Sequence, residues 1–282
     1  MNILRELWMK MMKFLKRLDQ ILMKKEYHIG KNGEKKEKIK FSLPRETEEI
    51  IKQHVPPPEK ASSLFPQWYK DMPKYNGKET KMRTMNGWHN LTVKNCMPFL
   101  DSMTNGYILK TWCDITVKRN KNNEVEISHG EYENIVKSWN IPLIYGGKGF
   151  PSHIPTMSGF EPFDYVLSMY WRITTPPGYS CLITNPFNRT DSPFFTLTGI
   201  IETDLWHGTE VVNTALKKDF EGVIPKGTPY LQIIPFKRVD WESNVVLEVN
   251  ENYENIRNES IKYRAESKYG YYRDKIWKKK NY

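Results

Sequence analysis

Short runs of β-branched and aromatic residues alternate with turns rich in Pro, Gly and Asn along the chain from Tyr107 to Arg238. The turns follow one another at intervals of about ten residues, which is the spacing of all-β sandwiches and barrels. Parallel α/β folds need a long crossover between consecutive strands, and these intervals leave no room for one. This part of the chain is therefore predicted to fold as a mainly β sandwich or barrel.

Several turns in this region have residues that specify their geometry. Tyr107–Arg119 is followed by the polar stretch Asn120–Asn123 and then by Val125–Ser128, a pattern that predicts a β-hairpin. The pair Pro177–Gly178 predicts a type II turn, because glycine supplies the positive φ at its third position. Gly227 is predicted to do the same before the last strand.

The positive charge is concentrated at the two ends of the 282-residue chain. Residues 1–40 carry 12 Lys and Arg against 5 Asp and Glu, and residues 262–282 carry 8 against 2, within a total of +10. The region between them is slightly acidic, so the β domain is not expected to bind nucleic acid. Four parts are predicted: an amphipathic basic helix (1–29), a charged linker and Pro-rich strap (30–84), a mostly β domain (85–242) and a helical basic C-terminal arm (243–282).

The N-terminal segment has a hydrophobic seam at helical spacing. Its apolar residues recur at alternating intervals of four and three, with lysines on the other face: Leu4, Trp8, Met11, Leu15, Leu18 and Leu22. Three interpretations stay open: a helix that docks on its own domain or on a neighbouring copy, a short coiled coil, or a basic helix on a membrane surface. Because Lys and Arg interrupt the segment, neither a signal peptide nor a membrane span is expected.

The C-terminal arm interleaves aromatic and basic residues. Among the lysines and arginines stand four aromatic side chains, Tyr269, Tyr271, Tyr272 and Trp277. This composition can bind single-stranded nucleic acid weakly through stacking and charge. The alternative is a terminal helix that its aromatic side chains anchor on the domain.

Cysteine and histidine offer little chemistry in this chain. The three cysteines show no CxxC spacing, so they are expected to be reduced thiols of a cytosolic protein, with Cys181 inert in a buried strand. His129, Glu131 and the distant His207 meet the minimum ligand pattern of a metal-dependent oxygenase, but His129 falls at a predicted solvated turn. The expectation is no cofactor and no metal, with these three residues as weak metal candidates.

A polar loop between Pro186 and Pro193 is the candidate ligand-binding site. It groups polar side chains in one short stretch: Asn188, Arg189, Thr190, Asp191 and Ser192. The guanidinium of Arg189 offers planar, bidentate donors to a phosphate or a carboxylate. The alternative is that the cluster only satisfies the hydrogen bonds of its own turn.

Residues 174–238 resemble the central part of the dUTP pyrophosphatase and dCTP deaminase superfamily. The family motifs are a PPGY turn, a polar loop, a Gly-Ile-Ile segment that carries two carboxylates, and a final strand with a glutamine. They correspond here to Pro176–Tyr179, Asn188–Ser192, Gly199–Asp204 with Gly208, and Lys226–Ile234. The resemblance covers under a quarter of the chain, and it implies a β-clip (dUTPase-like) fold.

The same resemblance implies candidate catalytic and binding residues. Asp204 matches the second carboxylate of the family motif and Gln232 matches the glutamine of the last strand, whereas Glu202 replaces the water-activating aspartate. Glutamate places its carboxylate one methylene further out, and a shift of about 1 Å in an active site can cost about a hundredfold in rate. The glycine-rich C-terminal arm of the family has no counterpart here. The resemblance therefore implies a retained scaffold without pyrophosphatase activity.

A second resemblance covers the chain from about Pro56 to Trp241. The segments FPQWYKDMP, CMPFLDSMTNGYILKTWCDI, TPPGYSCLITNPFNR and GTPYLQIIPFKR together resemble a protein family of tailed phages of marine cyanobacteria. This resemblance brings no activity with it. It implies a viral protein that is located in the cytoplasm of the infected host cell or in the virion.

One function is expected, with two alternatives. The chain is expected to be a non-catalytic binding or assembly protein, a homo-oligomer with phage or host proteins as further partners. The first alternative is a nucleotide- or small-acid-processing enzyme that uses Glu202 and Asp204 with Arg189 as its anion clamp. The second alternative is a structural protein of the virion. The interpretation depends on the polar loop at 188–192 lying near Glu202.

Overall fold

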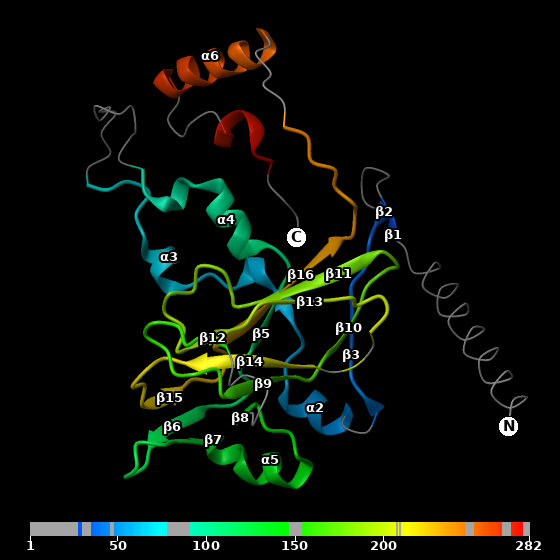
Figure 1. Ribbon diagram of the computed structural model, residues 1–282, viewed down its shortest axis with the longest axis vertical. Helices are drawn as coiled ribbons and strands as arrows, with labels where there is room; N and C mark the ends of the chain where they lie inside the picture. The colour runs from blue at the N-terminus through cyan, green and yellow to red at the C-terminus, as the bar shows by residue number, and fades with distance from the viewer. Residues whose placement is uncertain are drawn as a thin grey trace, which may run out of the picture.

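The computed structural model describes residues 28–29, 35–45, 48–77, 91–146, 154–206, 208, 210–245, 251–266 and 272–278 (Figure 1). The amphipathic helix predicted for residues 1–29, except for its last two residues, lies outside these ranges, as do His207, Tyr269 and Tyr271. Within the described ranges, no helix is both long enough and apolar enough to cross a lipid bilayer.

The fold is built mainly from short antiparallel strands. The largest sheet has five strands in the order β13 (Gly199–Ile201), β11 (Tyr179–Thr184), β16 (Pro229–Lys237), β5 (Tyr107–Lys110) and β4 (Glu59–Lys60). A four-stranded sheet has the order β12 (Phe194–Thr196), β14 (Glu210–Leu216), β9 (Tyr165–Met169) and β8 (Ile144–Gly146). A three-stranded sheet has the order β15 (Gly222–Ile224), β6 (Ile115–Arg119) and β7 (Val125–Ser128). The predicted mainly β fold class is confirmed.

Smaller elements complete the described chain. Two strand pairs are formed by β10 (Arg172–Thr174) with β3 (Lys40–Ser42) and by β1 (His28–Ile29) with β2 (Lys35–Lys36). The helices are α2 (Glu48–His54), α3 (Gln67–Asp71), α4 (Met97–Thr104), α5 (Glu133–Trp139), α6 (Glu251–Glu266) and a π-helical turn at Tyr272–Ile276. In Figure 1, α6 lies at one end of the long axis and α5 at the other, with the sheets between them.

One hydrophobic core is shared by the five-stranded and four-stranded sheets. Ile183 of β11 and Leu167 of β9 belong to the same buried cluster. Tyr230 of β16 is 2% exposed, and its hydroxyl donates a hydrogen bond to the carbonyl of Ser168 in β9 at 2.9 Å. A buried tyrosine needs such a partner for its hydroxyl, and this one links the two sheets directly.

Residues that precede the predicted β domain also belong to the fold. β3 pairs with β10, and β4 forms one edge of the five-stranded sheet. Ile51 and Ala61 are 2% and 1% exposed, and Trp171 Nε1 donates to the carbonyl of Pro56 at 3.1 Å. The described β fold therefore includes residues from Lys40 onward, and the Pro-rich segment lies on its own domain.

The predicted turns are confirmed. The β6–β7 hairpin turns through Asn120–Asn123, with Asn123 at a φ of 64°. Gly178 has a φ of 85°, and Tyr179 N donates to the carbonyl of Pro176 at 3.2 Å, as a type II turn requires. Gly227 has a φ of 89° in the turn before β16.

Candidate functional site

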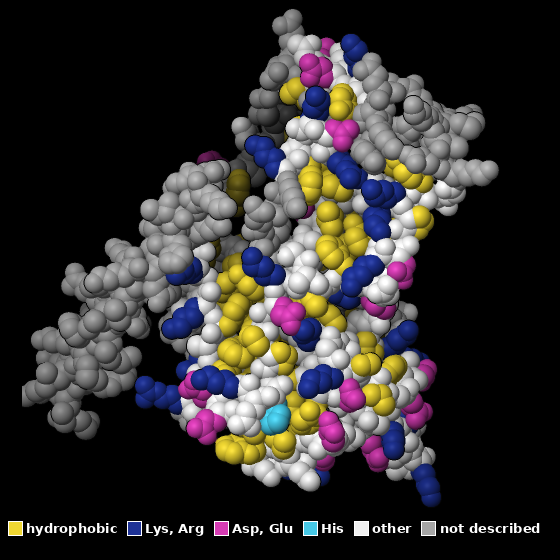
Figure 2. Space-filling model, turned by 180° about the vertical axis from the view of Figure 1, so that it is seen from behind, with side chains coloured by type: hydrophobic (Ala, Val, Ile, Leu, Met, Phe, Trp, Pro, Cys, Tyr) yellow, Lys and Arg dark blue, Asp and Glu magenta, His cyan; other side chains and the backbone are white. Residues whose placement is uncertain are grey.

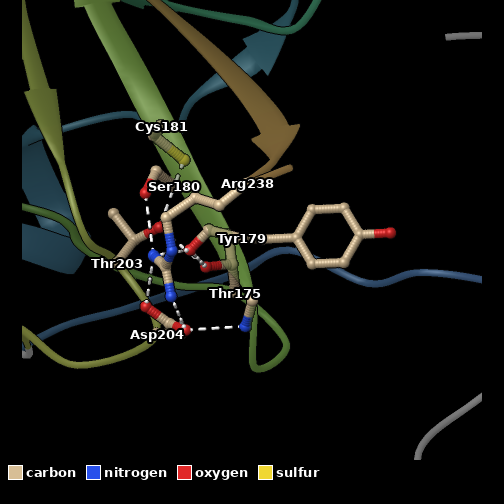
Figure 3. A network of polar contacts seen from close by, with 8 residues as sticks. Thr175, Tyr179, Ser180, Cys181, Thr203, Asp204 and Arg238 are labelled. Atoms are coloured by element: carbon tan, nitrogen blue, oxygen red, sulfur yellow. Dashed lines mark hydrogen bonds and ion pairs between the residues drawn. The ribbon is translucent and has the colours of Figure 1, made fainter. Parts of the chain in front are cut away.

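The candidate catalytic carboxylate of Asp204 lies in a polar network where β11, β13 and β16 meet (Figure 3). Arg238 Nη1 donates to Asp204 Oδ1 at 2.8 Å, Arg238 Nη2 pairs with Oδ2, and Gly178 N donates to Oδ2 at 2.7 Å. The Asp204 side chain is only 4% exposed. Burial raises the pKa of Asp204, but the hydrogen bonds from Arg238 and Gly178 outweigh it and hold the pKa below its usual value.

The guanidinium of Arg238 also fixes the start of β11. Its Nη1 donates to the carbonyl of Tyr179 at 2.9 Å and to Ser180 Oγ at 2.8 Å, while Arg238 N donates to the carbonyl of Gly178 at 2.8 Å. The Tyr179 ring points away from this network (Figure 3). Both oxygens of Asp204 are therefore bound, and the carboxylate holds three strand ends together.

Two threonines extend this network into the core. The hydroxyls of Thr175 and Thr203 lie 2.7 Å apart, and Thr203 Oγ1 donates to Cys181 Sγ at 3.4 Å. Burial raises the pKa of the Cys181 thiol to about 11, although the hydrogen bond from Thr203 acts against it. The prediction of an inert, buried Cys181 is confirmed.

Glu202, the second candidate catalytic residue, has a different environment. Its side chain is exposed, and it makes no hydrogen bond or ion pair with the residues that the structure describes. Its carbonyl accepts from Leu205 N at 2.9 Å and from Trp206 N at 2.8 Å, which closes the turn after β13. The hydrogen bonds that Arg238 donates to Asp204 raise the pKa of Arg238 most, and the neighbouring charge of Glu202 also helps to raise it.

The polar loop and Glu202 lie at opposite ends of β11. Ile201 pairs with Cys181, so Glu202 lies near the start of β11, whereas the loop follows Thr184, which pairs with Gln232. A strand rises about 3.3 Å per residue, so the two ends of this six-residue strand are about 17 Å apart. The expectation that the loop lies near Glu202 is wrong within a single chain. Sequence order suggested proximity, but the strand register separates them.

The polar groups of the loop are largely used inside the fold. Asn188, at a φ of 59°, donates from Nδ2 to Ser102 Oγ at 2.9 Å, and Arg189 donates to the carbonyl of Leu64. Burial lowers the pKa of Arg189, and the nearby carboxylate of Asp191 acts against that change. Ser192 Oγ donates to the carbonyl of Phe194 at 2.6 Å. These contacts support the alternative in which the cluster stabilises its own turn.

Gln232 is the internal anchor of the same loop. It is 1% exposed, and its Oε1 accepts from Phe187 N at 2.9 Å. Its Nε2 donates to the carbonyls of Asn105 at 2.7 Å and Ser102 at 3.0 Å. All of these partners are backbone groups, so Gln232 joins the loop to the C-terminal end of α4.

Thr190 and Asp191 remain open to solvent beside a shallow hollow. Asp191 is one wall of a cavity of about 430 Å³, whose other walls are Pro193, Phe220, Val223 and the turn at 224–229. Its remaining polar side chains are those of Thr228, whose Oγ1 donates to the carbonyl of Pro225 at 2.6 Å, and Lys226, whose Nζ lies 5.6 Å from the centroid of the Tyr132 ring.

The metal candidates do not form a site in the described chain. His129 is 5% exposed, so the prediction of a solvated turn is wrong: the segment that follows, η4 (Gly130–Tyr132), packs it inward. Its Nε2 accepts from Leu143 N at 3.1 Å, and burial lowers its pKa although Glu133 acts against that change. Glu131 is exposed and His207 lies outside the described residues. Over the described ranges, no three metal-ligating side chains come together.

The C-terminal arm contacts the domain through two of its predicted residues. Trp277 Nε1 donates to the carboxylate of Asp101 at 3.1 Å, and Arg273 Nη1 donates to Asn95 Oδ1 at 2.7 Å. Asn95 is buried, and Asp101 belongs to α4. These contacts support the interpretation in which the arm is anchored on the domain.

An apolar surface beside the Asp204–Arg238 ion pair was not predicted from the sequence. Its side chains are largely exposed: Ile200 at 65%, Leu205 at 67%, Trp206 at 55%, Val239 at 50% and Trp241 at 89%. We call these five residues the end surface. Leu205 and Trp206 follow Asp204, and Val239 and Trp241 follow Arg238, so the ion pair brings these two groups to one end of the sheet. Ile200 lies on the edge strand β13, where it pairs with Leu182. The sequence alone does not show that Leu205 and Trp206 lie near Val239 and Trp241, because the two groups are far apart in the chain and only the folded structure brings them together.

No protein-family model matches the chain, and neither does any curated protein. Among solved structures, it is similar to a mutant dUTPase of Staphylococcus bacteriophage 80alpha at 10% identity and a TM-score of 0.30, over 76% of this chain and 99% of that one. It is also similar to a mutant dUTPase from phage phi11 of S. aureus at 12% identity and a TM-score of 0.26, over 51% of this chain and 84% of that one. Likenesses at these scores carry no activity, substrate or partner to this chain.

Proposed function

We propose that the chain is a binding or assembly protein that forms homo-oligomers and does not use Glu202 and Asp204 for catalysis. The observation that carries this proposal is the Asp204–Arg238 ion pair. Arg238 and Gly178 donate hydrogen bonds to both oxygens of this carboxylate, whose side chain is 4% exposed, so it is bound within the fold and poorly placed to act on a substrate or water. Glu202 is exposed at that end of β11, beside the Asp204–Arg238 ion pair, and the polar loop lies at the other end.

The end surface supports assembly. Large exposed apolar patches on folded proteins mark interaction sites, and solitary exposed side chains do not. β13 is an edge strand of the five-stranded sheet, and such edges favour association with another chain when charges do not protect them. Seen from behind, the described surface also has hydrophobic side chains in a broken band beside Lys and Arg (Figure 2).

The cellular setting belongs to the same proposal. The resemblance to phage proteins supports a location in an infected host cell or in the virion, with phage or host proteins as further partners. Mass spectrometry of purified virions separates the two: a structural protein is found in stoichiometric amounts, and an assembly factor is absent.

Enzyme assays test the non-catalytic part of this proposal. The full-length protein is incubated with dUTP and dCTP, and the products are separated by chromatography. We expect no turnover and no thermal stabilisation by either nucleotide, whereas a ligand at about 100 times its Kd adds about 2.7 kcal/mol. Turnover that disappears in Glu202→Gln would refute the proposal in favour of the enzyme alternative.

A further inference from the structure

The end surface is apolar at its centre and acidic at its rim. The exposed carboxylates of Glu202, Asp240 and Glu242 border it. The described cations beside it are Lys40, Lys237 and Arg238, and Arg238 is already held in an ion pair. A complementary partner therefore brings an apolar stripe that is flanked by positive charge.

The N-terminal segment of the same sequence has this character. Its seam of Leu, Trp and Met at helical spacing is flanked by Lys10, Lys13, Lys16 and Arg17. Its sequence pattern therefore complements the end surface in both polarity and charge.

Strand β3 begins near this surface. Lys40 of β3 pairs with Thr174 of β10. The next residue, Thr175, shares a hydroxyl hydrogen bond with Thr203, which precedes Asp204. Lys40 is therefore close to the end surface, and residues 3–22 precede it in the sequence.

The size of the surface fits a protein partner. With about 250 Å² for a fully exposed tryptophan, Trp206 and Trp241 together offer about 360 Å². That is close to half of the roughly 800 Å² that each partner buries in a standard interface. Leu205, Val239 and Ile200 add to it. The exposed area is adequate for contact with one amphipathic helix.

We propose that the end surface of one copy binds residues 3–22 of a second copy. This inference rests on the proposed assembly function and names its surface and its occupant. The side chains of the end surface are exposed, with Trp241 at 89%, and the proposed self-association favours a segment of a second copy as their partner. A reciprocal exchange between two copies covers both surfaces and closes the assembly.

Photo-cross-linking of the full chain tests this inference. The photo-reactive amino acid p-benzoylphenylalanine is placed at position 241, and protein labelled with ¹⁴N is mixed with protein labelled with ¹⁵N before irradiation. Mass spectrometry should find position 241 joined to a peptide from residues 3–22, with both isotopes in one product. The same amino acid in place of Trp139, which is 50% exposed at the end of α5, is the matched control and should not give this product.

The outcomes separate this inference from the proposed function. Loss of the mixed-isotope product in Leu15→Asp, with retention in Lys52→Ala, would support the seam as the occupant. Cross-linked products that contain only one isotope would mean that residues 3–22 bind the end surface of their own chain. That result would overturn the proposed exchange between two copies. Products that join position 241 to another segment of a second copy would overturn the claim that residues 3–22 bind the end surface, but they would leave the proposed assembly function intact. A monomeric protein without intermolecular products would overturn the proposed function itself.

Discussion

The carboxylate of Asp204 matches a catalytic position by sequence and acts as a structural group in the fold. Its motif resembles that of an enzyme family, but Arg238 and Gly178 bind both of its oxygens. The sequence gives no sign of Arg238 as its partner, because the two residues are 34 positions apart. Glu202 keeps an exposed side chain, and Arg238, whose pKa its charge helps to raise, is already paired with Asp204.

Removal of the Asp204 carboxylate should destabilise the fold. Breaking a buried ion pair costs about 3–5 kcal/mol, and Arg238 is one-third exposed, so we expect a loss of about 3 kcal/mol for Asp204→Ala. The matched control is Glu48→Ala, which breaks an exposed i,i+4 pair with Lys52 and should cost under about 1 kcal/mol. Urea unfolding measures both free energies. Equal losses would mean that Asp204 has no scaffold role.

The same carboxylate should contribute a pH dependence to stability. Because the folded-state pKa of Asp204 is below its unfolded value of about 3.9, the unfolded chain binds more protons in acid. Its contribution is therefore complete above about pH 4 and is lost as the pH falls through the folded-state pKa. In Asp204→Asn, the free energy of unfolding should fall less between pH 5 and pH 3, as urea titrations at each pH would show. An unchanged slope would argue against the ion pair.

At the scale of elements, the sequence predicts those features that depend on a few neighbouring residues, such as turns. Gly178 and Asn120–Asn123 were predicted correctly because their turns depend on φ preferences of a few residues. The separation of the polar loop from Glu202 could not be predicted, because it depends on which residue of β11 pairs with which residue of β13 and β16. The burial of His129 was missed for the same reason, since Leu143, its hydrogen-bond partner, is distant in sequence.

The junction between α4 and β5 offers a test at this scale. Gly106 has a φ of 75°, and an added Cβ would lie 2.0 Å from the carbonyl oxygen of Ile233 in β16. Gly178 has a φ of 85°, but no atom lies within 4 Å of its Cβ position. Gly178→Ala should therefore cost only the left-handed strain of about 1–2 kcal/mol, and Gly106→Ala should cost clearly more. Urea unfolding compares the two, and equal costs would contradict the packing of α4 against β16.

At the scale of the whole molecule, exposed apolar side chains and the polar loop lie at opposite ends of the five-stranded sheet. The ion pair of Asp204 and Arg238 fixes the segments that carry Leu205, Trp206 and Trp241. The polar loop, at the far end of β11, is bound to α4 and to the strap by Asn188 and Arg189. This arrangement favours a protein that associates through one end of its five-stranded sheet over one that encloses a small substrate there.

The most direct test of this account is the mass of the full-length protein in solution, measured by light scattering after size-exclusion chromatography. The account predicts a multiple of 33.5 kDa for the wild type and for the control Trp139→Asp, and a single chain of 33.5 kDa for Trp206→Asp. Circular dichroism would show that both variants are folded. A wild-type protein that elutes as a single chain, or a Trp206→Asp variant that keeps the wild-type mass, would contradict assembly through the end surface.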